Sequence, residues 1–231
     1  MNEPTVLHDD RQWLVLNKPA GWHCVETKKT DGHPVVETWL RKHLEACKEL
    51  PEAGLCHRLD LGTTGCLVVA KWRPIRERLR RAMSGDPAAR PAAKTYVALV
   101  TPGLPPVGRF ELYFSGHEAR VRTGEIGQAE QKGICRWKLI RPAQKNASGA
   151  EQFDALEVNL NGPGRRHQIR AGLSHFGHPL VGDQTYGGVA WAEGTGWAAL
   201  HAHRITLDGT TVVAPPPEAW HLDSLQPDDP L

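Results

Sequence analysis

Hydrophobic residues gather in short runs that turn-forming residues separate along most of the chain. Residues 13–16 read W-L-V-L and stop at N-K-P-A-G, which predicts a strand that leads into a loop. Residues 66–70 are apolar and partly β-branched, as in a buried strand. Gly, Pro and Asn turns delimit the further strands that we expect at residues 95–100, 108–114, 119–123, 134–140, 153–160 and 200–207.

Three other segments have apolar residues at the three- and four-residue steps of a helical face. The first follows Pro34 and ends before Pro51, the second covers residues 74–83, and the third covers residues 169–176. Strands broken by a few helices, without regular β-α-β alternation, predict an α+β fold with a mostly antiparallel sheet.

Length and composition fit an ordinary globular protein. The chain has 231 residues, 40% hydrophobic and 23% charged, which excludes a disordered or membrane class. Its N-terminus lacks a signal pattern, and no apolar run approaches the ~18 residues that a membrane span needs. Five scattered cysteines without a C-x-x-C spacing indicate reduced, buried thiols, so we expect a cytoplasmic protein.

Charge is unevenly distributed, although the formal net charge is only +2. Residues 71–94 hold eight basic and two acidic residues, whereas residues 205–231 hold five acids and no Lys or Arg. Such asymmetry is common in nucleic-acid binders, because only the docking face must meet phosphates. A solvated helix face plus an acidic tail explains it equally well. Residues 215–231 are expected to form that peripheral tail.

Two polar segments could carry chemistry. Asp60 lies in H-R-L-D-L-G-T-T-G, a loop that can display a carboxylate to a substrate, or simply a turn whose aspartate bonds nearby amides or Arg58. Residues 164–170 read G-R-R-H-Q-I-R at a predicted helix start, which favours an anion but also fits a solvated basic face. An inward-pointing Arg170 would need a carboxylate partner.

Two other site types are disfavoured. The pair His201 and His203, with His175 and His178, has a metal-like spacing, but Asp183 is the only carboxylate placed to join and no thiolate pair assists. We therefore expect no metal. The string H-R-L-D also differs from the kinase H-R-D loop by an inserted leucine, and no G-x-G-x-x-G loop precedes it.

Six elements in a fixed order resemble those of the RluA-type pseudouridine synthases. H-R-L-D-x-x-T-T-G at residues 57–65 resembles the family's H-R-L-D-x-x-T-S-G, and residues 17–21 resemble its N-K-P-x-G. The other matches are K-T-Y at 94–96, G-R-R-H-Q-I-R at 164–170, G-H-P-L-V-G-D through Y-G at 177–187, and L-H-A at 200–202. Thr64 replaces the usual serine, and Arg166 replaces the usual threonine.

The resemblance implies a mixed, mainly antiparallel sheet with flanking helices and a central cleft. It implies isomerisation of uridine to pseudouridine in RNA without metal or cofactor. Asp60 corresponds to the catalytic carboxylate, Arg170 to the arginine that pairs with it, and Tyr96 to the tyrosine that packs against the uracil. Ile169 and Leu200 fall where the family has apolar pocket walls, although buried core is equally plausible. Supporting substrate contacts are expected from His57, Arg58, Thr63, Arg165, His167 and Gln168.

The remaining expectations concern partners and domains. Charge alone suggests that Lys71, Arg73, Arg76 and Arg80 contact RNA phosphates. We expect residues 1–231 to form one catalytic domain without an N-terminal S4-like domain, acting as a monomer on tRNA or rRNA. The competing hypothesis is a noncatalytic RNA-binding protein or RNA chaperone that retains the fold.

Overall fold

The computed structural model describes residues 2–27, 32–116, 120–143, 153–191 and 196–222. The helices within this part of the chain are α1 (Val36–His43), α2 (Arg73–Ser84) and α3 (Gln168–His175). The strands are β1 (Thr5–Asp9), β2 (Trp13–Lys18), β3 (Thr64–Ala70), β4 (Ala93–Val100), β5 (Val107–Ser115), β6 (Arg122–Gly124), β7 (Lys132–Arg141), β8 (Asp154–Asn161), β9 (Leu200–Leu207) and β10 (Thr210–Val213).

The chain forms two compact units. Unit 1 comprises Met1–Ala92 and Ala202–Pro215, and unit 2 comprises Ala93–His201 and Pro216–Leu231. The chain therefore passes from unit 1 to unit 2, returns within β9, and leaves unit 1 again after β10. A helix long and apolar enough to cross a bilayer does not occur among the described residues.

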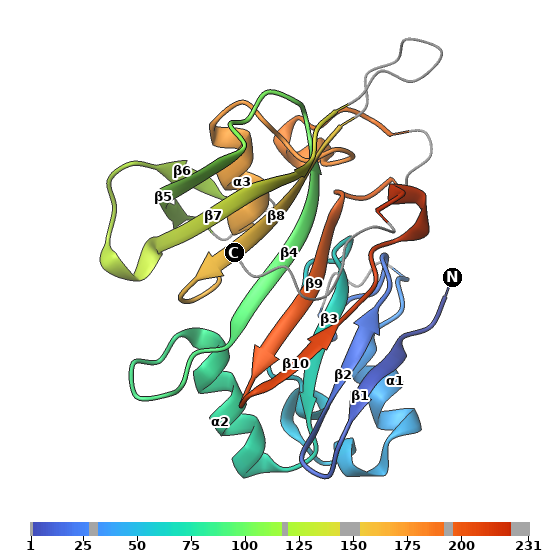
Figure 1. Cartoon of the computed structure of the whole chain (residues 1–231). Coiled ribbons are helices and arrows are strands. Elements are labelled where there is room, and N and C mark those ends of the chain that lie inside the picture. The colour runs from blue at the N-terminus through green and yellow to red at the C-terminus, as the bar shows by residue number, and fades with distance from the viewer. Residues whose placement is uncertain (1, 28–31, 117–119, 144–152, 192–195, 223–231) are drawn as a thin grey trace. The chain divides into compact units, whose positions relative to one another are not determined.

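Unit 1 is built on strands in the order β1-β2-β3-β9, with β10 paired to β9 (Figure 1). β2 pairs antiparallel with β1 and β3, and β10 pairs antiparallel with β9. The central strands β2 and β3 are almost continuously apolar and buried, which explains why their runs are legible in the sequence.

The helices of unit 1 follow their amphipathic patterns. α2 buries Leu79, Ala82 and Met83 and ends at Gly85, whose φ of 71° is the left-handed conformation that favours glycine at a helix C-terminus. α1 is shorter than predicted, because Leu44 adopts an extended conformation (φ −129°) and a 3₁₀ turn, Glu45–Cys47, follows it.

Unit 2 has the antiparallel strand order β4-β8-β7-β5-β6. α3 packs on one face of these strands (Figure 1), where Phe110, Leu112 and Cys135 are buried. Gly172 permits this contact, because a Cβ atom there would lie 2.2 Å from Cζ of Phe110. Small residues at such positions let a helix approach a sheet closely.

The α+β class and the mainly antiparallel pairing are confirmed. The sequence prediction missed β1, an edge strand whose residues are mostly exposed, and β10. The turn before β10 is Asp208-Gly209, both with positive φ, which is the usual chemistry of a tight hairpin. β6 covers residues 122–124, so it overlaps the strand expected at 119–123 only at residues 122 and 123, and residue 119 lies outside the described part.

The first part of the segment predicted to be a peripheral tail is packed against unit 2. Trp220 and Leu222 are buried in a cluster of unit 2 with Val97, Leu99, Ala155, Val181 and Ala199. Arg141 donates hydrogen bonds from NH1 to the carbonyl oxygens of Trp220 (2.8 Å) and His221 (2.9 Å). Residues 216–222 therefore belong to the packed body of unit 2, and residues 223–231 lie outside the described chain.

Candidate active site

The predicted site residues divide between the two units. Asp60 and its neighbours in the H-R-L-D loop belong to unit 1, as do the basic residues of α2. Tyr96, Arg170 and the G-R-R-H-Q-I-R segment belong to unit 2, with Leu200 at the start of β9. We therefore describe the predicted residues of each unit separately.

In unit 1, hydrogen bonds fix the backbone on both sides of Asp60. The Cys24 thiol donates to the carbonyl oxygen of Leu59 (3.3 Å) and accepts from the Leu59 amide (3.2 Å). On the other side, the carbonyl oxygen of Leu61 accepts from the Gly21 amide (2.9 Å) and from Nζ of Lys18 (3.1 Å). The half-buried Asp60 carboxylate is therefore displayed from a loop that the N-K-P-A-G element holds.

Lys18 is the most completely buried charged residue in this region, with 0% exposure. Its Nζ atom also donates to the carbonyl oxygen of Pro19 (2.9 Å). Burial lowers the pKa of Lys18 to about 8, while the charges of Cys24 and Asp60 act in the opposite direction. Lys18 is thus electrostatically coupled to Asp60 and bonded to the residue next to it.

The loop joins β3 through two further features of the motif. Nε2 of His57 accepts a hydrogen bond from the Val68 amide (3.0 Å), so this side chain supports the loop. Gly65 has φ 100°, and a Cβ atom there would lie 2.3 Å from the carbonyl oxygen of Ala202. The motif's last glycine is therefore required both by backbone conformation and by the close approach of β9.

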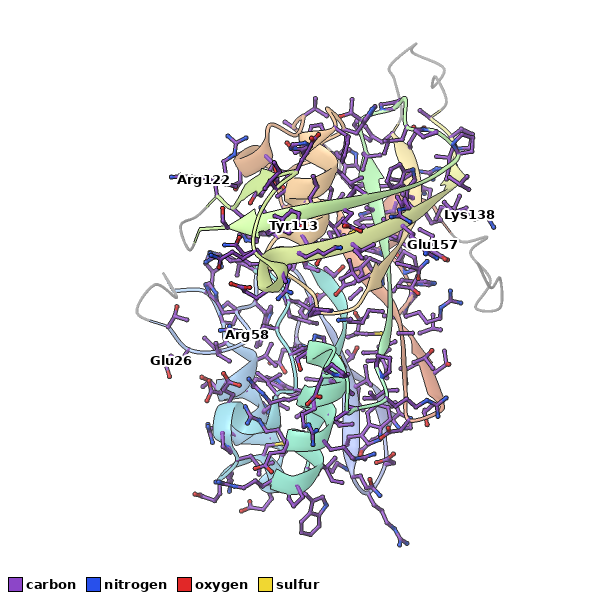
Figure 2. All side chains as sticks on the ribbon, turned by 90° about the vertical axis from the view of Figure 1, so that its left-hand side faces the viewer. Glu26, Arg58, Tyr113, Arg122, Lys138 and Glu157 are labelled. Carbon is purple, nitrogen blue, oxygen red and sulfur yellow. The ribbon has the colours of Figure 1, made fainter. Side chains whose placement is uncertain are left out.

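Thr63 and Arg58 have different environments in this loop. Thr63 is 3% exposed, and its amide donates to the Asp60 carbonyl oxygen (3.0 Å) to close a turn. Arg58 is exposed, and Figure 2 shows it on its loop. Arg58 is accordingly accessible to an RNA ligand, whereas Thr63 shapes the loop.

In unit 2, Asp183 forms a two-point salt bridge with Arg170. Nε and NH2 of Arg170 donate to the two carboxylate oxygens of Asp183 at 2.7 and 2.8 Å. Their side chains are 12% and 1% exposed. The buried guanidinium therefore has the carboxylate that its position demands.

Tyr186 completes the surroundings of Arg170. The guanidinium carbon lies 5.3 Å from the centre of the Tyr186 ring, within cation–π range. The Tyr186 hydroxyl oxygen lies 2.9 Å from Nδ1 of His167 and accepts from the Val121 amide (2.8 Å). The G-D-x-x-Y-G element therefore fixes the orientation of the arginine in G-R-R-H-Q-I-R.

The start of α3 is also tightly organised. Gln168 is buried, accepts from the Arg165 amide (2.8 Å) through Oε1, and donates to the Ile134 carbonyl oxygen (3.1 Å) through Nε2. Nε of Arg165 donates to the Lys132 carbonyl oxygen (2.8 Å). His167 has a left-handed φ of 52° immediately before the helix. Gln168 is thus structural, while Arg166 is exposed.

The candidate base-contacting residues are buried. Tyr96 is 9% exposed, Leu200 6% and Ile169 3%. Tyr96 lies on β4 opposite Val158 of β8, on the same strand face as Lys94, two residues earlier. Such low exposures fit both alternatives that the sequence left open, namely the wall of a closed pocket and the buried core.

The basic residues of α2 have varied environments. Arg76 is 9% exposed, and it bonds the Leu55 carbonyl oxygen and the Glu52 carboxylate (2.6 Å). Arg80 pairs with the same carboxylate (2.7 Å), and Lys71 pairs with Asp9. Arg73 and Arg80 are exposed. Arg76 therefore has an evident structural role, and the exposed Arg73 and Arg80 are better placed for phosphate contacts.

Thiol and metal chemistry find little support in the described residues. The five cysteines are all buried and unpaired with one another. Burial raises the pKa of Cys56 and of Cys66 to about 12, so neither is ionised at neutral pH. Among the described residues, no group of three or more His, Cys, Asp or Glu side chains could hold a metal ion. His203 is one of the histidines with a metal-like spacing, and its Nδ1 atom lies 2.8 Å from the Ala214 carbonyl oxygen.

Sequence reasoning overlooked the roles of Lys18, Asp183 and Tyr186. All three lie in segments that match the family's motifs, so the signal in the sequence was their position within those motifs. Their functions depend on contacts between distant residues, such as Lys18 with Leu61, which a linear pattern does not display.

Comparison with known proteins identifies the family. A family model described as RNA pseudouridylate synthase matches residues 12–175, which include the Asp60 loop, Tyr96 and Arg170. The chain belongs to this family, as the motif resemblance predicted.

Among curated proteins, the chain is similar to ribosomal large subunit pseudouridine synthase D of Yersinia pestis, with 32% identity over 87% of this chain and 62% of that protein. It is 30% identical to the Nitrosomonas europaea protein of the same name, over 96% of this chain and 58% of that one. The chain thus spans about three fifths of these relatives. Human RNA pseudouridylate synthase domain containing 1 has the same fold, with a TM-score of 0.64 and 21% identity over 93% of this chain and 83% of that chain.

Proposed function

We propose that this protein isomerises uridine to pseudouridine in RNA, with Asp60 as its essential carboxylate. The observation that carries the proposal is the fixed presentation of Asp60. Its flanking residues are held by Lys18, Gly21 and Cys24, in a chain that belongs to the RNA pseudouridylate synthase family.

The reaction needs no net oxidation or added group. The N1–C1′ bond of uridine breaks, C1′ joins C5, C5 loses its proton, and N1 gains one. A carboxylate can assist by attacking the sugar or by stabilising it as the base departs. Asp60 is proposed for this role, and both routes release the C5 hydrogen to solvent.

Arg170 and Tyr96 are proposed to complete the site. Arg170 would pair with Asp60 and orient that carboxylate, while Asp183 holds the guanidinium in place. Tyr96 would stack on the uracil after the nucleotide is flipped out of its helix. Ile169 and Leu200 would form apolar walls. His57, Arg58, Thr63, Arg165, His167 and Gln168 would shape or contact the nucleotide's surroundings, directly or through the backbone.

The proposed substrate is ribosomal RNA of the large subunit, because the relatives named above carry that substrate in their names. The sequence also predicted tRNA as a possible substrate, so tRNA is the second RNA to assay. Exposed cations of α2, chiefly Arg73 and Arg80, would contact phosphates, with Lys71 and Arg76 in the same region. The enzyme would act as a cytoplasmic monomer, without metal or cofactor.

The test is tritium release from rRNA and tRNA that contain 5-tritiated uridine. The wild-type protein should release tritium, and Asp60→Asn should abolish release while retaining the wild-type circular dichroism spectrum and melting temperature. Asp208→Asn, which changes a surface aspartate of the same unit, is the matched control and should remain active. An Asp60→Asn protein that keeps wild-type RNA affinity and all cellular phenotypes would instead favour a noncatalytic RNA-binding protein.

A further inference from the structure

A buried lysine lies beside the turn that precedes α3. Lys94 is 9% exposed, and its Nζ atom donates to the Gly162 carbonyl oxygen (3.4 Å). The same atom lies 3.8 Å from the position that a Cβ atom would take at Gly164. An ammonium group is thus placed against a Gly-Pro-Gly turn, within unit 2.

Two arginines follow this turn directly. Arg165 is half-buried and held in place through its amide and its Nε atom, whereas Arg166 is exposed. Gly162 has φ 87° and open space where a side chain would be, so the turn is accessible from that side. The Lys94 ammonium group thus lies against the turn, and two arginines follow that turn directly in the chain. This local concentration of positive charge favours an anionic ligand.

Tyr96 connects this cluster to the proposed base site. Lys94 and Tyr96 are two residues apart on β4, so their side chains leave the strand on the same face. Their separation along the strand is about 7 Å, comparable with the span between the base and the phosphate of one nucleotide. A nucleotide whose uracil stacks on Tyr96 could therefore extend its phosphate toward Lys94.

We propose that Lys94, Arg165 and Arg166 form a phosphate-binding subsite for the RNA nucleotide whose base stacks on Tyr96. Arg166, which stands where the family usually has threonine, adds a cation to this subsite. The inference rests on the proposed function, since it assigns Tyr96 the base. Burial lowers the pKa of Lys94, and a bound phosphate would favour the charged form instead.

The first experiment measures the dissociation constant for a short oligouridylate as a function of salt. Arg166→Thr should weaken binding and reduce the slope of log K against log salt by about 1. Arg136→Thr is the matched control, because Arg136 is an exposed arginine on β7, opposite Asn159 of β8, and so lies on the sheet face away from Lys94. It should leave the dissociation constant within about twofold of wild type.

Lys94→Met repeats the test on the buried group, with Lys138→Met as its control. Lys138 lies opposite Glu157 in the register of β7 and β8, on the sheet face that Arg136 occupies, and Figure 2 labels both side chains. Should Lys94→Met fail to fold, the exposed Arg166 still tests the subsite. Equal dissociation constants and salt slopes for Arg166→Thr and Arg136→Thr would overturn the proposal.

The second experiment changes the phosphate. RNA in which the linkage next to the modified uridine is a neutral methylphosphonate should bind wild-type protein about tenfold more weakly than unmodified RNA, whereas Arg166→Thr should lose less affinity. Equal losses in both proteins would contradict the subsite. Because binding is measured without turnover, a wild-type protein that releases no tritium would refute the proposed isomerase activity while leaving the phosphate subsite testable by itself.

Discussion

At the scale of single residues, Lys18 and Asp183 hold other groups of the candidate site in place. Lys18 donates to the carbonyl oxygen of Leu61, the residue after Asp60, and Asp183 accepts from Nε and Nη2 of Arg170. Both are almost fully buried. We therefore expect both side chains to act on the proposed reaction by positioning Asp60 and Arg170.

Lys18→Met should lower kcat by roughly 10- to 100-fold, because misplacing a catalytic group by about 1 Å costs this much. Stability should change less than activity, since an apolar side chain avoids the cost of burying a charge. Tritium release and urea unfolding would measure the two effects. Lys48→Met alters a half-exposed lysine of a surface ion pair and should change neither. A Lys18→Met protein with the wild-type kcat would show that Lys18 does not support Asp60 in the reaction.

Lys18 also predicts opposite pH effects on activity and stability. Its pKa is about 8 in the folded protein and 10.5 in the unfolded chain, so the unfolded chain binds more protons between these values. The contribution of Lys18 to stability should therefore rise with pH across this window. Activity should fall as pH passes 8, because Lys18 loses the charge that acts on Asp60. If the activity of Lys18→Met falls above pH 8 as the wild-type activity does, deprotonation of Lys18 is not the cause of the fall.

Asp183→Asn should reduce stability by about 3–5 kcal/mol, because it leaves the Arg170 guanidinium buried without its counter-charge. The matched variant Asp208→Asn breaks a partly exposed pair with Arg78 and should cost less than about 1 kcal/mol. Chemical denaturation of both variants gives the comparison. Similar losses would mean that burial of the Arg170 pair has no special importance.

At the scale of elements, the family's glycines mark places where one segment approaches another. Gly65 at the start of β3 lies against the Ala202 backbone, and Gly182 lies against the Trp197 carbonyl oxygen. In both, a Cβ atom would come within 2.3 Å of that oxygen. The glycines of the T-T-G and V-G-D strings are therefore explained by the packing of chain segments.

Gly65→Ala should destabilise the protein by more than about 3 kcal/mol, because strain and a backbone clash act together. Gly209→Ala separates the two causes, since Gly209 has φ 85° but open space at its Cβ position. It should cost only about 1–2 kcal/mol, from conformation alone. Equal losses by thermal or urea unfolding would show that the contact with Ala202 contributes nothing.

The sequence predicted the elements whose burial pattern is regular. β2, β3 and α2 followed from apolar runs and helical spacing, because their buried residues are contiguous or periodic. β1 was missed because its residues are mostly exposed, and the end of α1 was missed because Leu44 turns extended without Gly or Pro. Local patterns do not report where tertiary packing ends a helix.

At the scale of the whole molecule, charge was only a partial guide. The basic run at residues 71–94 suggested either phosphate contacts or a solvated helix face, but Arg76 and Lys94 are buried and Arg80 shares Glu52 with Arg76. Motif positions predicted the family, which is confirmed, while the roles of Asp60, Tyr96 and Arg170 that the resemblance implies stay predictions. The supporting contacts of Lys18, Asp183 and Tyr186 required coordinates, because they join residues distant in sequence or pairs that no spacing rule identifies.

The proposed isomerisation of uridine in RNA depends on the Asp60 carboxylate. Tritium release from 5-tritiated uridine in rRNA and tRNA, compared between wild type and Asp60→Asn, is the most direct test. We expect release by the wild-type protein and none above background by a folded Asp60→Asn protein. Release by Asp60→Asn at the wild-type rate, or no release by the wild-type protein from any of these RNAs, would contradict it.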